Sequence, residues 1–406
     1  MNRSVAVVIG SVVAAVAGGL GALGATPGAG AAAPAATRGV TRTTVEVGAL
    51  LGAAPGADVG ARARFERENG RRGVAGRRID LVGVEHDGGD AAADLAAARK
   101  LVEQERVFAV VPVATRAVAA DYLRQQGVPF VGRATAEAWQ GNPDGFAFSG
   151  SGVTIRPVSA SPAWGALLKT LLGDGAGRTV AVVGDAGDLG AARVKAAVAS
   201  VQKAGFHVVY AKPGITGAAA PTDAVAAAGE VAHANAGQPS DVALLLQADP
   251  AAASSVARQL AVLAYTGTVG SDALYDPSSP GPAQGMTVLT DVAPIEQSTA
   301  ANRQLVADVK AIAPDAAITP GVVDGYWSAD LFIRVLRAVG KKLTVARFLR
   351  AANGGSFRYS VTATIGESTW PAMHTRGVPC GALVQSTGTR YVVAVPYRCG
   401  KPIKLK

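Results

Sequence analysis

Two kinds of hydrophobic pattern alternate along the chain. Short apolar runs rich in β-branched residues are typical of strands buried on both faces. These runs fall at 44–51, 78–86, 108–114, 129–134, 179–185, 207–212, 241–247 and 267–272. Between them are segments with apolar residues at helical spacing, such as 91–105, 114–127, 189–205, 251–264 and 326–340. The alternation predicts βαβ units and an α/β fold with parallel sheets.

The predicted strands form two sets of four, separated by the polar, Gly/Ser/Pro-rich passage 146–162. A chain of 406 residues is too long for one ordinary hydrophobic core. We therefore predict two doubly wound parallel-sheet lobes, with residues 43–150 and 290–340 in lobe 1 and residues 151–289 and 341–406 in lobe 2. The strand-like stretch 285–294 indicates a return crossing between them.

Residues 1–36 have the three-part pattern of a secretory signal peptide. Arg3 precedes an apolar run from about Val5 to Ala25, and small residues follow with A-x-A options between Ala29 and Ala36. An uncleaved membrane anchor is the alternative, because the run approaches spanning length. No Cys lies near the end of the run, which argues against a lipid-modified N-terminus. In either case the rest of the chain is expected outside the cytoplasm, at the cell envelope or beyond.

Two cysteines, Cys380 and Cys399, flank two strand-like runs around a Gly-containing turn. The midpoint of the pair falls beside Gly388, so the two residues are expected to face each other across a β-hairpin. In an exported protein this arrangement predicts a disulfide, with two free thiols as the alternative. The hairpin breaks the α/β pattern at the C-terminus.

The formal net charge is +9, and Arg3 is the only charged residue of 1–36, so the remainder carries +8. Most Lys and Arg residues are scattered, apart from "GRRGVAGRR" at 70–78 and the C-terminal tail. A nucleic-acid binder would gather its charge in a patch with interleaved aromatic residues. The composition therefore favours a solvated basic surface over nucleic-acid binding, while attraction to an anionic envelope needs no base recognition.

The sequence resembles the type I periplasmic binding proteins, in particular the leucine/isoleucine/valine-binding group that serves ABC importers. The resemblance covers roughly 43–345. It rests on the opening "VEVGALLG", on Asn69, Gly70, Gly73, Gly76, Arg77, Ile79 and Asp87, and on the later stretches "RTVAVVGDAGDLG" and "GSDALYDP". It implies a two-lobed clamp with three crossovers. In open α/β sheets the crevice at the carboxyl ends of the strands is also where ligands generally bind.

The resemblance implies two ligand-binding turns in lobe 1. Ala114 and Thr115 follow one strand, and the turn would supply a hydroxyl and backbone N–H groups to a carboxylate. Thr115 can equally be a helix N-cap. Arg133, Ala134 and Thr135 follow the next strand, where the family uses a backbone carbonyl and the Thr hydroxyl.

Lobe 2 is expected to contribute an acid to the same site. Asp272 stands where amino-acid binders in this family carry the carboxylate that pairs with the ligand ammonium, although an Asp after a strand also commonly caps a turn. In the loop "GDAGDLG" at 184–190, Leu189 stands where the family often has a Tyr, just before the last Gly. Tyr275 and Tyr326 either wall the cleft or belong to the core.

The motifs do not favour an enzyme. His86, His207, His233 and His374 have no metal-binding spacing, and there is no G-x-S-x-G or phosphate-binding loop. Neither a metal nor a cofactor is expected. The leading hypothesis is a monomeric, exported solute-binding protein that takes a small polar ligand to an ABC permease. The alternative is an extracellular ligand-sensing or envelope-interaction module without a transport role.

Overall fold

The computed structural model describes residues 37–53, 55–114, 116–134, 139–151, 157–215 and 221–405. The predicted signal peptide, residues 1–36, lies outside these ranges. Residues 37–406 make up one compact unit. No helix among the described residues is long and apolar enough to cross a membrane.

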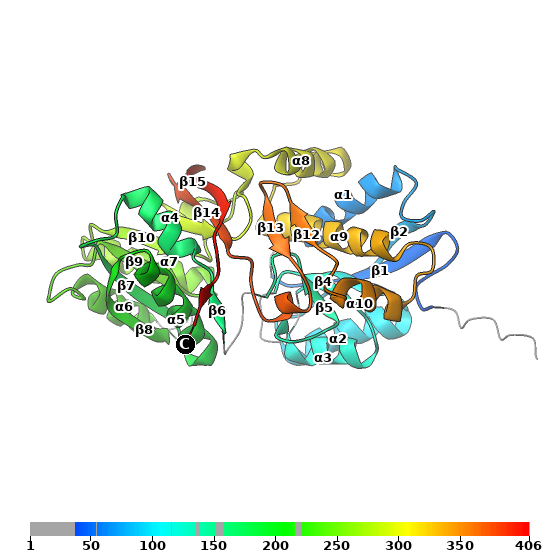
Figure 1. Ribbon diagram of the computed structural model, residues 1–406, viewed down its shortest axis with the longest axis horizontal. Coiled ribbons are helices and arrows are strands. Elements are labelled where there is room, and N and C mark those ends of the chain that lie inside the picture. The colour runs from blue at the N-terminus through cyan, green and yellow to red at the C-terminus, as the bar shows by residue number, and fades with distance from the viewer. Residues whose placement is uncertain are drawn as a thin grey trace, which may run out of the picture. The chain divides into compact units, whose positions relative to one another are not determined.

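The first sheet is parallel throughout, with the strand order β2-β1-β3-β4-β5. Figure 1 labels its strands β1, β2, β4 and β5. Its strands are β1 (Thr44–Leu51), β2 (Arg78–His86), β3 (Ala109–Val113), β4 (Phe130–Gly132) and β5 (Gly145–Ala147). The first four confirm the predicted runs, whereas β5 lies at the start of the passage expected to separate the lobes. The helices of this part are α1 (Ala57–Asn69), α2 (Ala91–Arg99), α3 (Ala117–Gln125), α8 (Ala300–Ile312), α9 (Pro320–Val339) and α10 (Val345–Asn353).

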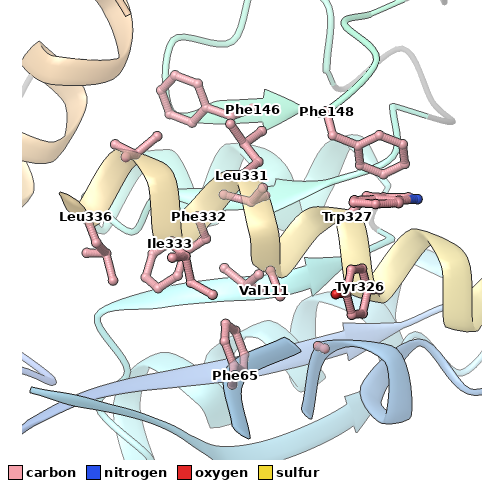
Figure 2. Packing of buried hydrophobic residues seen from close by; sticks show 14 of the residues in the cluster. Phe65, Val111, Phe146, Phe148, Tyr326, Trp327, Leu331, Phe332, Ile333 and Leu336 are labelled. Carbon is pink, nitrogen blue, oxygen red and sulfur yellow. The ribbon is translucent and has the colours of Figure 1, made fainter. Parts of the chain in front are cut away.

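Helix α9 lies at the centre of the core of the first sheet (Figure 2). The ring of Phe332 lies 6.4 Å from that of Phe65 on α1, 6.3 Å from that of Phe108 before β3, and 5.5 Å from that of Phe348 on α10. All four side chains are almost fully buried. Contacts among four separate segments therefore hold α9 against the sheet.

Two glycines allow α1 and α9 to approach each other closely. A Cβ atom on Gly60 would lie 2.0 Å from the carbonyl oxygen of Val322, and one on Gly325 would lie 1.8 Å from the carbonyl oxygen of Ala57. Both distances are far below van der Waals contact, so any side chain at either position would push the helices apart. The close contact brings the polar side chains of the two helices together.

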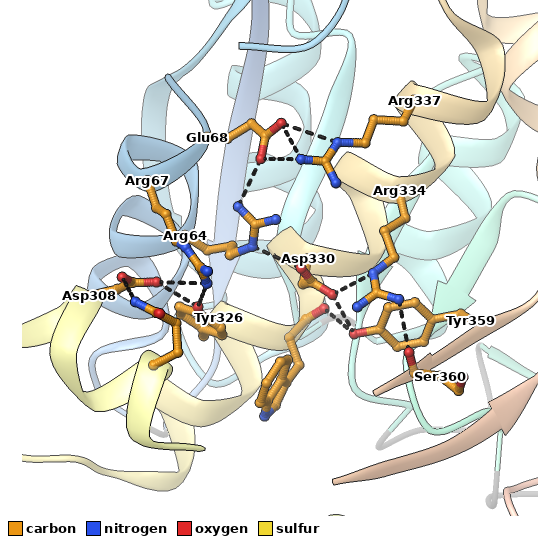
Figure 3. A network of polar contacts seen from close by, with 12 residues as sticks. Arg64, Arg67, Glu68, Asp308, Tyr326, Asp330, Arg334, Arg337, Tyr359 and Ser360 are labelled. Atoms are coloured by element: carbon orange, nitrogen blue, oxygen red, sulfur yellow. Dashed lines mark hydrogen bonds and ion pairs between the residues drawn. The ribbon is translucent and has the colours of Figure 1, made fainter. Parts of the chain in front are cut away.

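Those side chains form a buried ion-pair network between α1 and α9 (Figure 3). Arg64 donates to Glu68 at 3.1 Å and to Asp330 at 2.8 Å. Glu68 also accepts from Arg337 at 2.6 Å, and Asp330 accepts from the hydroxyl of Tyr359 at 3.3 Å. Arg64, Glu68 and Asp330 are each less than a tenth exposed, so each charge depends on its partners.

The second sheet has the order β15-β14-β11-β10-β9-β7-β8. Strands β7 (Thr179–Asp185), β8 (His207–Ile215), β9 (Val242–Leu246) and β10 (Thr268–Ser271) are parallel, as the pattern predicts. Strand β11 (Thr287–Thr290), within the stretch expected as a return crossing, is a fifth parallel strand beside β10. Strands β14 (Cys380–Ser386) and β15 (Tyr391–Cys399) are added antiparallel at the edge. The helices of this part are α4 (Ala163–Leu172), α5 (Gly187–Lys203), α6 (Pro221–Ala232) and α7 (Pro250–Val262).

The C-terminal hairpin and its disulfide confirm the prediction from the cysteine spacing. Cys380 and Cys399 are direct partners in the β14–β15 ladder and are joined by a disulfide. Beyond the hairpin, β16 (Ile403–Lys404) pairs with β6 (Ser159–Ala160). The tail therefore packs against the segment that leads into α4.

The segment after α9 differs from its expected place in lobe 2. Phe348 on α10, Tyr359 on β12 (Tyr359–Val361), Ile365 on β13 (Ile365–Ser368) and Trp370 belong to the core of the first sheet. The physical reason is the position of Phe348, which packs against Phe332 of α9. Only from Cys380 onward does the chain join the second sheet.

The chain passes between the two sheets three times, as the resemblance implies. The connections are 148–158 between β5 and β6, 291–299 between β11 and α8, and 369–379 between β13 and β14. We refer to them as crossovers 1, 2 and 3.

Candidate functional site

A cavity of about 530 Å³ lies where strands of both sheets end. Arg133 and Ala134 follow β4, Asp272 follows β10 and Asp291 follows β11, and all four line the cavity. Residues of all three crossovers also line it. The described residues thus place a cavity at the carboxyl ends of parallel strands, where ligand sites of α/β proteins generally occur.

Arg133 is the centre of a charged cluster on the side of the first sheet. Its Nη1 lies 2.7 Å from both carboxylate oxygens of Asp291, and its Nε donates to Asp324 of α9 at 2.8 Å. Its guanidinium also lies 5.0 Å from the ring centre of Phe148. Burial lowers the pKa of Arg133, but Asp291 and Asp324 outweigh it and raise the pKa overall. Arg133 therefore stays charged.

The two carboxylates around Arg133 differ in their protonation behaviour. Burial raises the pKa of Asp291, but the Arg133 guanidinium and the Ser149 hydroxyl hold it below its usual value. Burial raises the pKa of Asp324 by more than Arg133 lowers it. Asp291 therefore keeps its negative charge more readily than Asp324 does.

Asp291 also joins the crossovers to one another. Its Oδ2 accepts from the hydroxyl of Ser149 in crossover 1 at 2.8 Å, and Asp291 itself lies in crossover 2. Its backbone carbonyl accepts from the hydroxyl of Tyr397 on β15 at 3.2 Å. A group bound to Arg133 would therefore contact a cluster that includes two of the three connections between the sheets.

A second charged cluster lies on the side of the second sheet. Arg193, in the first half of α5, donates through Nη2 to Asp272 at 2.9 Å, and its Nη1 lies 3.6 Å from Asp185 at the end of β7. Asp272 raises the pKa of Arg193 more than burial lowers it. A guanidinium has five N–H donors, and only one hydrogen bond to the described residues uses them. Arg193 therefore has donors left for a ligand.

The rest of the lining is largely apolar and small. It includes Trp164, Leu246, Leu289, Val378 and several alanines, together with Ser and Thr side chains of the crossovers. Apolar walls with a few oriented polar groups are typical of sites for small organic ligands. The described lining has no His, and its one Cys is disulfide-bonded. No group of His, Cys, Asp and Glu among the described residues is arranged to hold a metal ion.

The structure brings three of the candidate residues together. Arg133, Ala134 and Asp272 line the same cavity. Thr115 and Thr135 lie outside the described residues.

The other four candidates are not among the residues that line the cavity. Ala114 follows β3, where its N–H bonds to the carbonyl of Leu50. Leu189 lies on α5 four residues before Arg193, and therefore on the same face of the helix.

Both tyrosines have hydrogen-bond partners outside the cavity. Tyr275 donates to Glu296 and accepts from the N–H of Ile295, both at 2.7 Å. Tyr326 is 1% exposed and donates to Asp308 at 2.6 Å. Their surroundings agree with the alternative that both belong to the core.

Sequence reasoning missed Arg193, Asp291 and the side chain of Arg133 as a charged group of the cavity. Asp291 had a usable signal, because it follows the strand-like stretch 285–290 as Asp272 follows its own strand. Arg193 also had one, since it lies one helical turn after Leu189. No signal in the sequence indicated which of these charged residues pair with one another.

The comparisons with known proteins agree with this architecture. A family model described as periplasmic binding protein matches residues 44–390. No curated protein matches the sequence.

Solved structures of similar fold include a fatty acid ABC transporter substrate-binding protein from Thermomonospora curvata, with 16% identity, a TM-score of 0.66, and coverage of 90% of this chain and 95% of that one. A solute-binding protein of R. palustris in complex with 4-hydroxybenzoate has 15% identity and a TM-score of 0.66. The match covers 88% of this chain and 98% of that one. A third is the branched-chain amino acid transporter substrate-binding protein of Streptococcus pneumoniae in complex with isoleucine, with 15% identity and a TM-score of 0.62. This match covers 88% of this chain and 100% of that one. At such identities the likeness shows the fold alone.

Proposed function

Because the chain belongs to the periplasmic binding protein family, we propose that it captures a small polar ligand in the cavity between two lobes. The ligand classes that fit are amino acids, amides and small carboxylates. We further propose that the exported protein delivers the ligand to an ABC importer. The observation that carries the proposal is the cavity at the strand ends, with Arg133 on one side and Arg193 on the other.

A carboxylate is the ligand group that the site favours most. Among the described residues, only Asp272 accepts a hydrogen bond from Arg193, and guanidinium–carboxylate hydrogen bonds are among the strongest in proteins. Asp272, expected to pair with a ligand ammonium, already accepts from Arg193. An ammonium group would therefore share this acid with Arg193, whereas a carboxylate would meet free donors. Fatty acids, 4-hydroxybenzoate and isoleucine, named for the similar structures, all contain a carboxylate.

Thermal unfolding with a ligand panel tests the proposal. The panel contains isoleucine, isoleucinamide, benzoate, 4-hydroxybenzoate and a medium-chain fatty acid. A bound ligand at about 100 times its Kd stabilises the folded state by about 2.7 kcal/mol, which is readily measured as a rise in Tm. Mass spectrometry of small molecules retained through purification extends the panel. A protein that retains nothing and responds to no carboxylate would contradict the proposal.

Substitutions at Arg193 and Asp272 distinguish the two possible head-group contacts. Arg193→Ala is expected to weaken a carboxylate ligand at least tenfold, because a charge-assisted hydrogen bond contributes about 1.5–3 kcal/mol. Asp272→Asn is expected to weaken an amino acid more than a carboxylate that lacks an amine. Lys203→Ala, at the exposed end of the same helix, is the control. Isothermal titration calorimetry measures all three, and equal affinities for wild type and Arg193→Ala would remove Arg193 from the site.

A further inference from the structure

The edge of the first sheet opposite the cavity is strongly basic. Strands β1 and β2 begin at this edge, and helices α1 and α9, which run back along the sheet, end there. The segments that meet at it are 37–43, 70–78 and 340–353, and none contains Asp or Glu. Their exposed basic residues other than Arg78, which we call the basic edge, are Arg42, Arg71, Arg72, Lys341, Lys342, Arg347 and Arg350.

Several contacts place these segments at one edge. The Nε of Arg77 donates to the carbonyl of Thr41 at 2.8 Å, which joins 70–78 to 37–43. Arg337 pairs with Glu68 at 2.6 Å and so joins the end of α9 to the end of α1. Figure 3 shows this pair between the two helices.

Helix α10 extends the same edge toward β5. Phe348 packs 5.7 Å from the ring of Phe108, which immediately precedes β3. The Nδ2 of Asn353 donates to the carbonyl of Pro143, just before β5. The exposed Arg347 and Arg350 of α10 therefore belong to the same surface as Lys341 and Lys342.

The side chains of the basic edge make no hydrogen bond or ion pair with any residue that the structure describes. By contrast, Arg78, the first residue of β2, pairs with Glu66 and Asp80. Cations near a helix C-terminus interact favourably with the helix dipole and so stabilise the helix. Arg67 and Arg337 already occupy such positions in the last turns of α1 and α9. Helix stabilisation does not account for Arg42 before β1 or for Arg347 in the first half of α10.

The chain enters the described structure at this edge. Arg38 donates to the carbonyl of Val107, next to the start of β3, and Val40 pairs with Val45 at the start of β1. The apolar run from Val5 to Ala25 precedes this point in the sequence. In the sequence, residues 26–36 separate that run from the first described residue, Thr37.

We propose that the basic edge binds an anionic phospholipid surface. Each Lys or Arg close to such a surface contributes about 1 kcal/mol, and several together hold a protein there without a covalent lipid. The attraction weakens with salt, because charges at a surface are screened over about 10 Å at 0.1 M. This role is independent of the ligand cavity.

Vesicle co-sedimentation of the full-length chain tests the proposal. Wild type is compared on phosphatidylcholine vesicles and on vesicles with about one-third phosphatidylglycerol. The apolar N-terminal run is common to all variants, so the measured quantity is the ratio of binding to anionic and neutral vesicles. R71E/R72E/K341E is expected to lower this ratio at least tenfold at low salt.

A matched charge reversal distinguishes a local surface from net charge. K203E/R258E/R390E changes three exposed basic residues around the second sheet by the same total charge and is expected to keep the wild-type ratio. Circular dichroism confirms that both variants are folded. An equal loss of binding in both variants, or a wild type without preference for anionic vesicles, would overturn the proposal. Retention on heparin without vesicle binding would also overturn it, in favour of a soluble polyanion.

Discussion

Replacing Asp330 with Ala is expected to lower the free energy of unfolding by about 3–5 kcal/mol, the usual cost of removing one partner of a buried ion pair. Asp330 is 6% exposed and accepts from Arg64 at 2.8 Å. Its other oxygen lies 2.9 Å from the Nε of Arg334 and 3.3 Å from the hydroxyl of Tyr359. The substitution leaves the buried guanidinium of Arg64 with Glu68 alone and removes a partner of the buried Tyr359 hydroxyl.

Urea unfolding followed by circular dichroism measures this change. Glu367→Ala is the matched control, because Glu367 pairs with Arg358 on the surface, where both side chains are more than half exposed. Surface pairs contribute between about 0 and 1 kcal/mol, so the control is expected to unfold almost as wild type does. If Asp330→Ala and Glu367→Ala had the same small effect, the network of Figure 3 would not stabilise the contact between α1 and α9.

Much of the fold was predictable because its parallel strands are buried and their pattern is local. Strands β1, β2 and β7 have the bounds that the apolar runs predict. Gly52 follows β1, Gly76 and Asp87 flank β2, and Gly177 precedes β7. The cysteine pair was predictable for a similar reason, since a hairpin places residues equidistant from its turn opposite each other.

The parts that sequence reasoning missed depend on contacts between distant residues. Strand β5 lies where the polar, Gly/Ser/Pro-rich passage begins, and what defines it is its pairing with β4. The place of α10 depends on Phe348 meeting Phe332 and Phe108, which no local pattern encodes.

In the candidate site, too, the local features were predictable and the contacts between distant residues were not. Strand ends are visible in the sequence, and Asp272 and Ala134 were found there for that reason. Their partners were not visible, because Arg193 and Asp272 are 79 residues apart and Arg133 and Asp324 are 191 residues apart. A charged residue after a strand therefore indicates a position in the cavity but not whether another side chain of the protein already binds it.

Removing the disulfide is expected to lower the free energy of unfolding by about 3 kcal/mol, because the bond closes a loop whose free ends would gain entropy in the unfolded chain. Cys380 and Cys399 are 19 residues apart and join the first residue of β14 to the last residue of β15. Differential scanning calorimetry of C380A/C399A is expected to show a lower Tm than that of the oxidised wild type. The same ligand should still bind, since β14 remains paired with β11 from Ala382 to Gln385.

Reductant provides the control for this prediction. Adding dithiothreitol to wild type is expected to lower its Tm toward that of C380A/C399A, whereas the variant itself should not respond. Thiol titration of the unfolded protein establishes that the bond was present before reduction and absent afterwards. A wild type whose Tm is unchanged after complete reduction would mean that the β14–β15 ladder and the packing of Tyr391 and Val395 hold the hairpin without the covalent link. Because Cys380 also lines the cavity, a change in ligand affinity on reduction, at a temperature well below Tm, would show that the disulfide shapes the site as well as stabilising the fold.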